Sequence, residues 1–132
     1  MEPVLCYRID APLADAEASV RGALQKEGFG ILTEVDVTGV LRAKLGVETR
    51  PYKILGACNP SIAHRAMGAD PRVGAFLPCG LAIYEEEDGH TTVCLQNPSL
   101  ISETFHTQGL EEAANEAQER LVAALRSVAT PA

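Results

Sequence analysis

Cysteine is the residue type in this sequence with the widest chemical repertoire, and Cys58 occupies the position that most favours reactivity. It ends the apolar segment from Tyr52 and directly precedes Asn59 and Pro60, a pair typical of a helix start. A thiol at a helix N-terminus meets oriented N–H dipoles, which favour the thiolate that acts as nucleophile or metal ligand. Packing at the strand end is the competing interpretation, because free cysteine is among the most buried residue types.

Cys79 stands between Pro78 and Gly80, which fix a bend and leave little bulk beside its sulfur. We expect Cys58 and Cys79 to meet at one site. Such a pair would act as a dithiol and disulfide switch, or bind a soft ion such as Cu(I) or Zn(II). No Cys-x-x-Cys is present, and two thiolates alone do not complete a structural zinc site, which has four ligands.

His64 falls one and a half turns into the helix that follows Cys58, where it would serve as a base or a third ligand. A lone helical histidine beside Arg65 is otherwise a surface residue. His90 and His106 have no neighbours that indicate a role. The ligand-binding candidates are therefore Cys58, Asn59, Pro60, His64 and Cys79.

The remaining cysteines, Cys6 and Cys94, lie within predicted strands among apolar neighbours, so core packing explains both. A reducing cytosol makes free thiols the expectation for all cysteines. The acidic run from Glu85 to Asp88 points its side chains to alternating faces of a strand and predicts a solvated hairpin tip.

The elements that position these residues follow from periodicity and from turn residues. Strands are predicted for Val4 to Ile9, Phe29 to Val35, Tyr52 to Cys58, Leu81 to Glu87 and Thr91 to Gln96, with a short strand before Pro78. Helices are predicted after the Asp10 cap up to Gly28, from Asp36 to Gly46, from Asn59 to about Met67, and from Gly109 to Val128. Asp88 and Gly89 indicate a type I′ hairpin turn.

A late hairpin and helices able to share one face favour an α+β fold, an antiparallel sheet with helices packed on one face. At 132 residues, with no repeat or linker, the chain is expected to form one domain over residues 1–132.

Two motifs carry a family resemblance. The segment from Tyr52 to Pro60, with its Cys-Asn-Pro, and the segment from Pro71 to Cys79, with its Leu-Pro-Cys, together resemble the family called domain of unknown function 302. The resemblance implies a sheet related to a single repeat of the TATA-binding-protein fold, and a homodimer. It implies no established reaction.

Charge and missing motifs exclude several classes of function. A formal net charge of −7 without a basic cluster argues against nucleic acid and against anionic lipid as partners. No signal peptide or membrane-spanning run is present, so we expect a cytoplasmic protein. The phosphate-loop, dinucleotide, zinc-protease and nucleophile-elbow motifs are absent.

Three hypotheses of function remain. The first is a homodimeric binding or accessory protein with a small-molecule or soft-metal site at Cys58 and Cys79. The second is a thiol-dependent redox or transfer enzyme with Cys58 as nucleophile and Cys79 as resolving thiol. The third is a structural or interaction domain without a site.

Overall fold

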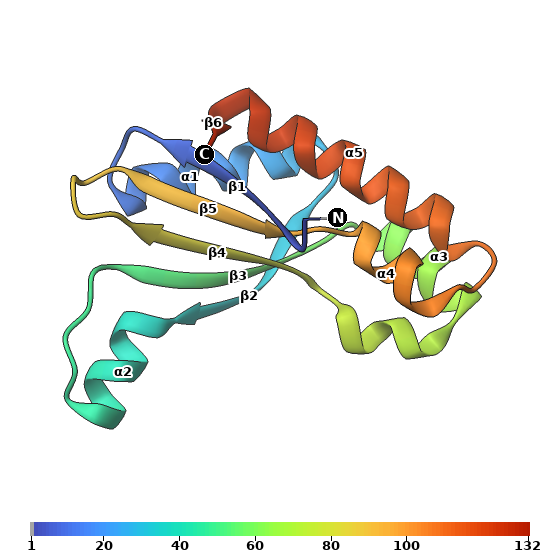
Figure 1. Ribbon diagram of the computed structural model, residues 1–132, viewed down its shortest axis with the longest axis horizontal. Helices are drawn as coiled ribbons and strands as arrows, with labels where there is room; N and C mark the ends of the chain where they lie inside the picture. Colours follow the sequence, from blue (N-terminus) through green and yellow to red (C-terminus); the bar gives the residue numbers. More distant parts are fainter. Residues whose placement is uncertain (1) are drawn as a thin grey trace.

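The computed structural model describes residues 2–132 and contains a six-stranded sheet in which every neighbouring pair of strands is antiparallel (Figure 1). The strands are β1 (Val4–Ile9), β2 (Gly30–Asp36), β3 (Tyr52–Cys58), β4 (Cys79–Glu85), β5 (Thr91–Gln96) and β6 (Thr130–Pro131). The helices are α1 (Leu13–Lys26), α2 (Val37–Leu45), α3 (Pro60–Ala69), the 3-10 helix η1 (Pro71–Phe76), α4 (Ser99–Phe105) and α5 (Leu110–Val128). The predicted α+β fold with an antiparallel sheet is confirmed.

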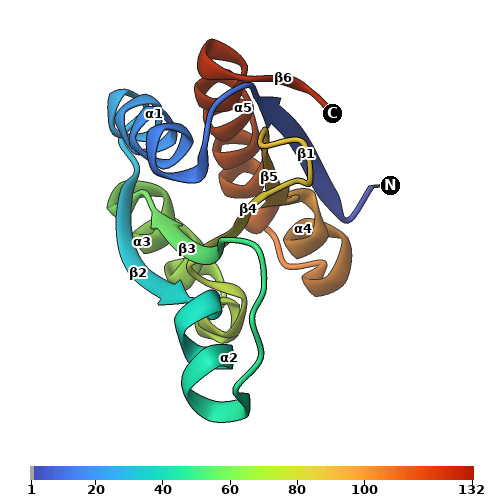
Figure 2. The same cartoon turned by 90° about the vertical axis from the view of Figure 1, so that its left-hand side faces the viewer.

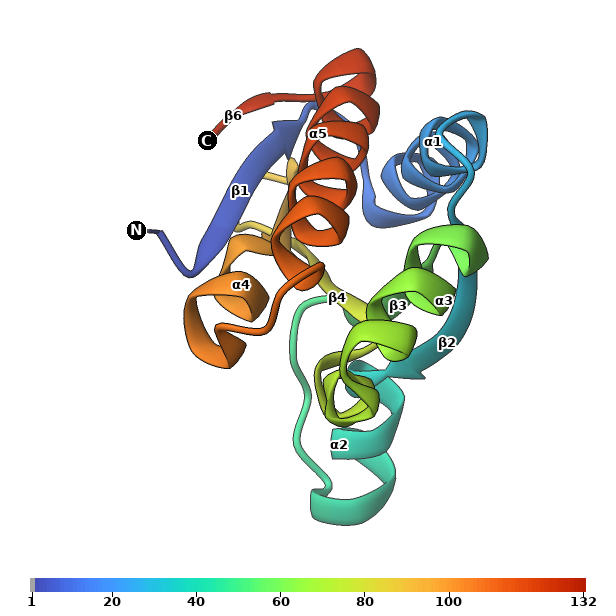
Figure 3. The same ribbon diagram turned by 90° about the vertical axis from the view of Figure 1, so that its right-hand side faces the viewer.

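The strand order is β2-β3-β4-β5-β1-β6, so β2 lies at one edge and the short β6 at the other. Helices α1, α3 and α5 lie together over one face of the sheet, and α5 packs against both of the others (Figure 3). Helix α2 instead projects from the β2 edge, away from this layer (Figure 2). In the described part of the chain, no layer of helices covers the second face of the sheet.

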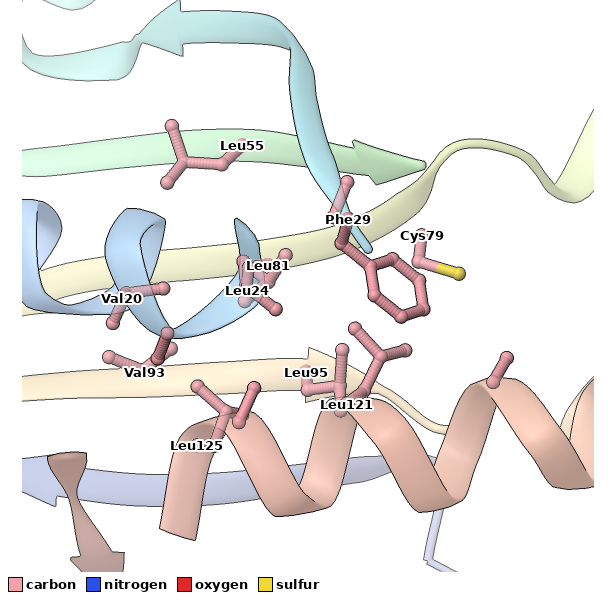
Figure 4. Packing of buried hydrophobic residues seen from close by; sticks show 14 of the residues in the cluster. Val20, Leu24, Phe29, Leu55, Cys79, Leu81, Val93, Leu95, Leu121 and Leu125 are labelled. Carbon is pink, nitrogen blue, oxygen red and sulfur yellow. The ribbon is translucent and has the colours of Figure 1, made fainter. Parts of the chain in front are cut away.

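The core lies between the sheet and α5. Apolar residues recur at helical spacing along α5, and Leu110, Ala114, Ala117, Leu121 and Leu125 are buried. Figure 4 shows Leu121 and Leu125 beside Val93 and Leu95 of β5. Because apolar residues recur every three or four positions, one face of α5 is covered along its length.

The helix boundaries reflect local capping. Asp36 caps the start of α2 by accepting a hydrogen bond from the backbone N–H of Gly39. Gly46 ends α2 in the left-handed conformation, as expected for a glycine at a helix C-terminus. The predicted Asp10 cap is wrong. Pro12 occupies the N-cap position of α1, and Asp10 instead forms an ion pair with Arg8 at 2.7 Å.

Two segments between helices and strands differ from the sequence predictions. The residues before Pro78 form η1 rather than a short strand, because the buried Asp70 accepts hydrogen bonds from the backbone and guanidinium of Arg72 and starts a helical turn. The β4–β5 hairpin is confirmed, but the type I′ turn is wrong. Only Gly89 has a positive φ there, and the pairing of Glu86 with His90 closes a longer loop.

The prediction of free core thiols at Cys6 and Cys94 is wrong, because the two residues form a disulfide. The β1–β5 register places them directly opposite each other. Both side chains are half-buried, whereas the neighbouring Tyr7, Val93 and Leu95 point to the helix layer and are buried. Alternation along each strand therefore puts the pair on the face without helices. Within residues 2–132, no helix has the length and apolar character needed to cross a membrane.

Candidate functional site

A cavity of about 30 Å³ lies where the ends of β3 and β4 meet the helix layer. Its walls are formed mostly by apolar side chains from β3, α3, α4 and α5 and from the segment before β2. They include Phe29, Ile62, Ala66, Ile101, Leu110 and Ala117. The remaining wall residues include both free cysteines, Cys58 and Cys79, together with Asn59.

The two free cysteines enter the cavity wall from neighbouring strands. Cys79 is the first residue of β4, pairs with Ala57 of β3 and is buried. Cys58 is the last residue of β3 and is half-buried. Figure 4 shows Cys79 beside the ring of Phe29 at the end of the sheet core. The structure thus brings both thiols to one cavity.

Asn59 is buried, and its polar atoms bind the backbone around it. Its side-chain oxygen accepts a hydrogen bond from the N–H of Ile62 at 3.2 Å and caps α3. Its Nδ2 donates to the carbonyl of Glu27 at 3.5 Å, beside Gly28, which has a φ of +83°. Asn59 therefore fixes the turn that carries Cys58 and ties this turn to the end of α1.

Pro60 and His64 do not line the cavity. Pro60 is the exposed first residue of α3. The side of α3 that faces the cavity carries Ile62, Ala63 and Ala66, and His64 lies on the exposed side of the helix. Helical geometry explains this separation, because residues two positions apart do not share a face.

The electrostatics at both thiols favour the protonated form. Burial, and secondarily the charge of Cys58, raises the pKa of Cys79 to about 11. Burial also raises the pKa of Cys58, although the thiol lies at a helix start. Two N–H groups of this helix start are not available to the thiol, because Pro60 has no N–H and Asn59 accepts a hydrogen bond from the N–H of Ile62. The expectation of a thiolate favoured by the helix N-terminus is therefore wrong.

A buried carboxylate connects segments that lie next to the cavity lining in the sequence. Asp70 accepts from the guanidinium of Arg72 at 2.7 Å and from the hydroxyl of Thr107 at 3.1 Å. These hydrogen bonds, led by that of the Arg72 side chain, hold the pKa of Asp70 well below its usual range. Arg72 also lies over the ring of Phe105, which makes an edge contact with Phe76. Asp70 thus joins η1 to the chain between α4 and α5.

The turn into β4 is fixed by close packing against a glycine of β3. The Leu77–Pro78 peptide bond is cis. A Cβ on Gly56 would overlap with the ring of Pro78 and with the hydroxyl of Thr33. Only glycine leaves room for this approach, which sets the position of Cys79 next to Pro78.

Few charged ligands are available around the thiols. Across the described residues 2–132, no three His, Cys, Asp or Glu side chains gather as a metal-ligand cluster. The arrangement therefore offers two thiol ligands in apolar surroundings. Sequence reasoning missed the part of the wall formed by Ile101, because this residue belongs to the segment from Leu100 to Gln108, where no motif was apparent.

The fold and the paired motifs define a small α+β protein with a thiol-lined cavity, and the comparisons give its family. The chain matches the family Domain of unknown function DUF302 over residues 5–128 and belongs to this family. It is similar to the crystal structure of the uncharacterized conserved protein DUF302 from Bacillus stearothermophilus, with 29% identity and a TM-score of 0.88. The similarity covers 97% of this chain and 99% of that one. No curated protein matches this chain.

Proposed function

We propose that this protein is a homodimeric binding or accessory protein that holds one soft metal ion, Cu(I), between Cys58 and Cys79. The observation that supports the proposal is the presence of both free thiols in the wall of one small cavity. Thiolates are the ligands that soft Cu(I) prefers. The protein would carry the ion in the cytoplasm.

The size of the cavity favours an ion over an organic ligand. A volume of about 30 Å³ corresponds to a few water-sized spheres. Pockets for organic ligands usually have about 300 Å³ or more. A single ion therefore enters with small adjustments of the walls, whereas an organic molecule requires the helices to move apart.

The ligand set also separates Cu(I) from Zn(II). Structural zinc binds four ligands, and no third Cys, His, Asp or Glu joins the pair in the described part of the chain. Both thiols have raised pKa values, so binding must displace their protons. Affinity should consequently fall as the pH decreases.

A small apolar molecule is the second candidate ligand, because the walls other than the thiols and Asn59 are apolar. The enzyme hypothesis has less support. A thiol catalyst needs an accessible thiolate, whereas burial raises the pKa of both cysteines and the lining holds no base.

The proposed dimer uses the β2 edge of the sheet and helix α2. Exposed large apolar side chains gather on β2, α2, the following loop and β3: Leu32, Val35, Val40, Leu45, Val47 and Ile54. We call this set the β2–α2 patch. Val35 and Ile54 are cross-strand partners, and no residue of α2 is buried. An amphipathic helix with an uncovered apolar side is typical of an interface, and the edge of β2 allows twofold pairing with a second copy.

A competition titration tests the metal site. Cu(I), supplied anaerobically, is distributed between the protein and a chromogenic chelator, and the bound copper is counted. A variant with Cys6→Ala and Cys94→Ala serves as the reference protein, because reduction of the disulfide would otherwise add two thiols. This variant should bind one Cu(I) per chain.

Adding Cys58→Ser or Cys79→Ser to the reference protein should abolish stoichiometric binding. His64→Ala is the matched control, since His64 lies outside the cavity lining, and it should bind like the reference protein. Equal binding by the Cys58→Ser variant and the reference protein would exclude the site.

Sedimentation analysis at micromolar concentration tests the dimer. Leu45→Glu, at the most exposed residue of the β2–α2 patch, should convert the dimer to a monomer. Val4→Glu is the matched control, because Val4 is also exposed but lies on β1, far from β2 in the strand order. A monomeric mass for the wild-type protein would remove the dimer from the proposal.

A further inference from the structure

The disulfide between Cys6 and Cys94 lies on the sheet face that carries no helix layer. Both cysteines are half-buried, so their sulfur atoms belong to neither the core nor the cavity. The pair connects β1 to β5, while Cys58 and Cys79 lie on β3 and β4. This disulfide is thus separate from the proposed metal site.

Cys94 has a hydrogen-bond donor beside its sulfur. The hydroxyl of Tyr84 lies 3.9 Å from Cys94 Sγ. Because a disulfide sulfur has no proton, the hydroxyl must be the donor. Burial raises the pKa of Tyr84, as do Glu86 and Tyr52, so the phenol keeps its proton at neutral pH. Stacking on Tyr52, with ring centres 5.1 Å apart, holds the ring in place.

Cys6 is reached from the opposite direction. A groove of about 430 Å³ is bordered by Cys6 and by residues near both ends of the described chain, among them Val4, Arg126 and Ala132. Cys94 does not border it. In the strand order β4-β5-β1-β6, Tyr84 lies on β4, next to the strand that carries Cys94. The groove lies between β1, which carries Cys6, and β6. The disulfide therefore has the groove on its Cys6 side and the Tyr84 hydroxyl on its Cys94 side.

We propose that Cys6 and Cys94 form a reversible thiol–disulfide exchange site that dithiol reductants reduce by attack on Cys6, with Cys94 as the leaving group. Attack on a disulfide proceeds along the sulfur–sulfur axis, and the groove borders Cys6 on the side away from Cys94, from which an attack on Cys6 would come. The Tyr84 hydroxyl stabilises the negative charge that develops on Cys94.

The electrons and protons balance within this exchange. A thiolate of the reductant forms a bond to Cys6 Sγ, and the bond between Cys6 and Cys94 breaks, which releases Cys94 as a thiolate that takes up a proton. The second thiol of the reductant loses its proton and attacks the mixed disulfide. Cys6 leaves as a thiolate and is protonated. The reductant is oxidised to a disulfide, and the protein gains two electrons and two protons.

The test is the reduction of the folded protein by dithiothreitol, followed by alkylation and peptide mapping. The rate of appearance of alkylated Cys6 and Cys94 should rise in proportion to the dithiothreitol concentration. A monothiol, 2-mercaptoethanol, quenched early, should form its adduct on Cys6 and leave Cys94 free for alkylation. Tyr84→Phe should slow reduction by about two- to tenfold, the range of one hydrogen bond.

Tyr52→Phe is the matched control, because it removes the hydroxyl from the other stacked ring and keeps the ring itself. It should be reduced at the wild-type rate. A rate that does not depend on dithiothreitol would show that the protein must unfold first, which would overturn the proposal. An adduct on Cys94, or equal rates for Tyr84→Phe and Tyr52→Phe, would overturn the assigned direction of attack.

Discussion

Reduction of the Cys6–Cys94 disulfide should lower the free energy of unfolding by several kilocalories per mole. The crosslink joins residues that are 88 positions apart, so it restricts most of the unfolded chain. The loop-entropy relation gives about 15 cal/mol/K for such a loop, or about 4.6 kcal/mol at 25 °C. This figure is an upper value, because a compact unfolded state already loses part of that entropy.

Urea melts of the oxidised and reduced wild-type protein measure the difference, since both contain the same side chains. The Cys6→Ala and Cys94→Ala double variant should melt like the reduced protein, and it should not respond to reductant. We expect the oxidised protein to be more stable by about 2 to 4.6 kcal/mol, up to the value from the loop-entropy relation. A difference below about 1 kcal/mol would refute the reasoning from loop length.

Three further variants test the fold. Leu121→Ala should lose about 2 to 4 kcal/mol in denaturant melts, because Leu121 is fully buried in the core, and a loss below about 0.5 kcal/mol would contradict its packing. Gly56→Ala should lower the free energy of unfolding by about 1 to 3 kcal/mol, because the added Cβ overlaps with Pro78. Gly80→Ala is the control at the cross-strand partner, where a Cβ meets open space, and it should be tolerated; equal losses in the two variants would contradict the close approach of Pro78 to Gly56. Because the pKa of Asp70 is lowered in the folded state, its stabilising effect is complete above the unfolded pKa of about 4 and is lost as the pH falls below that value. The difference in free energy of unfolding between wild type and Asp70→Asn should therefore decrease from pH 6 to pH 2, and a constant difference would contradict this reasoning.

Local patterns were sufficient to predict most of the elements that surround the site. The third strand ends at Cys58 as predicted, because a run of apolar and β-branched residues meets Asn59 and Pro60 there. The last helix begins and ends where its apolar repeat does. In such segments, neighbours in the sequence determine the structure.

The disulfide depends on the register between β1 and β5, which cannot be predicted from the sequence pattern of either strand alone. A slip of one residue would move Cys6 to the other face of the sheet and away from Cys94. Alternation of apolar residues shows that each strand has a buried face, but it does not align two strands. The apolar neighbours of Cys6 and Cys94, and the expectation of a reducing cytosol, therefore led to the wrong prediction of two free core thiols.

Only the part of the cavity wall that contains Cys58 and Cys79 was predictable from the sequence. Cys58 and Cys79 both lie at strand ends beside conformational breakers, which made a meeting of the two thiols a reasonable expectation. The opposite wall depends on how α4 and α5 pack over those ends, and the sequence between Leu100 and Gln108 has no clear period. The raised pKa of Cys58 follows from burial that only the packed structure shows.

Native mass spectrometry of the oxidised protein after anaerobic loading with Cu(I) tests the central proposal most directly, because one spectrum reports both assembly and bound metal. The wild-type protein should appear as a dimer with one copper per chain. The Cys58→Ser variant should appear as a dimer without copper. A wild-type protein free of copper, or a Cys58→Ser variant that retains it, would contradict a soft-metal site at Cys58 and Cys79.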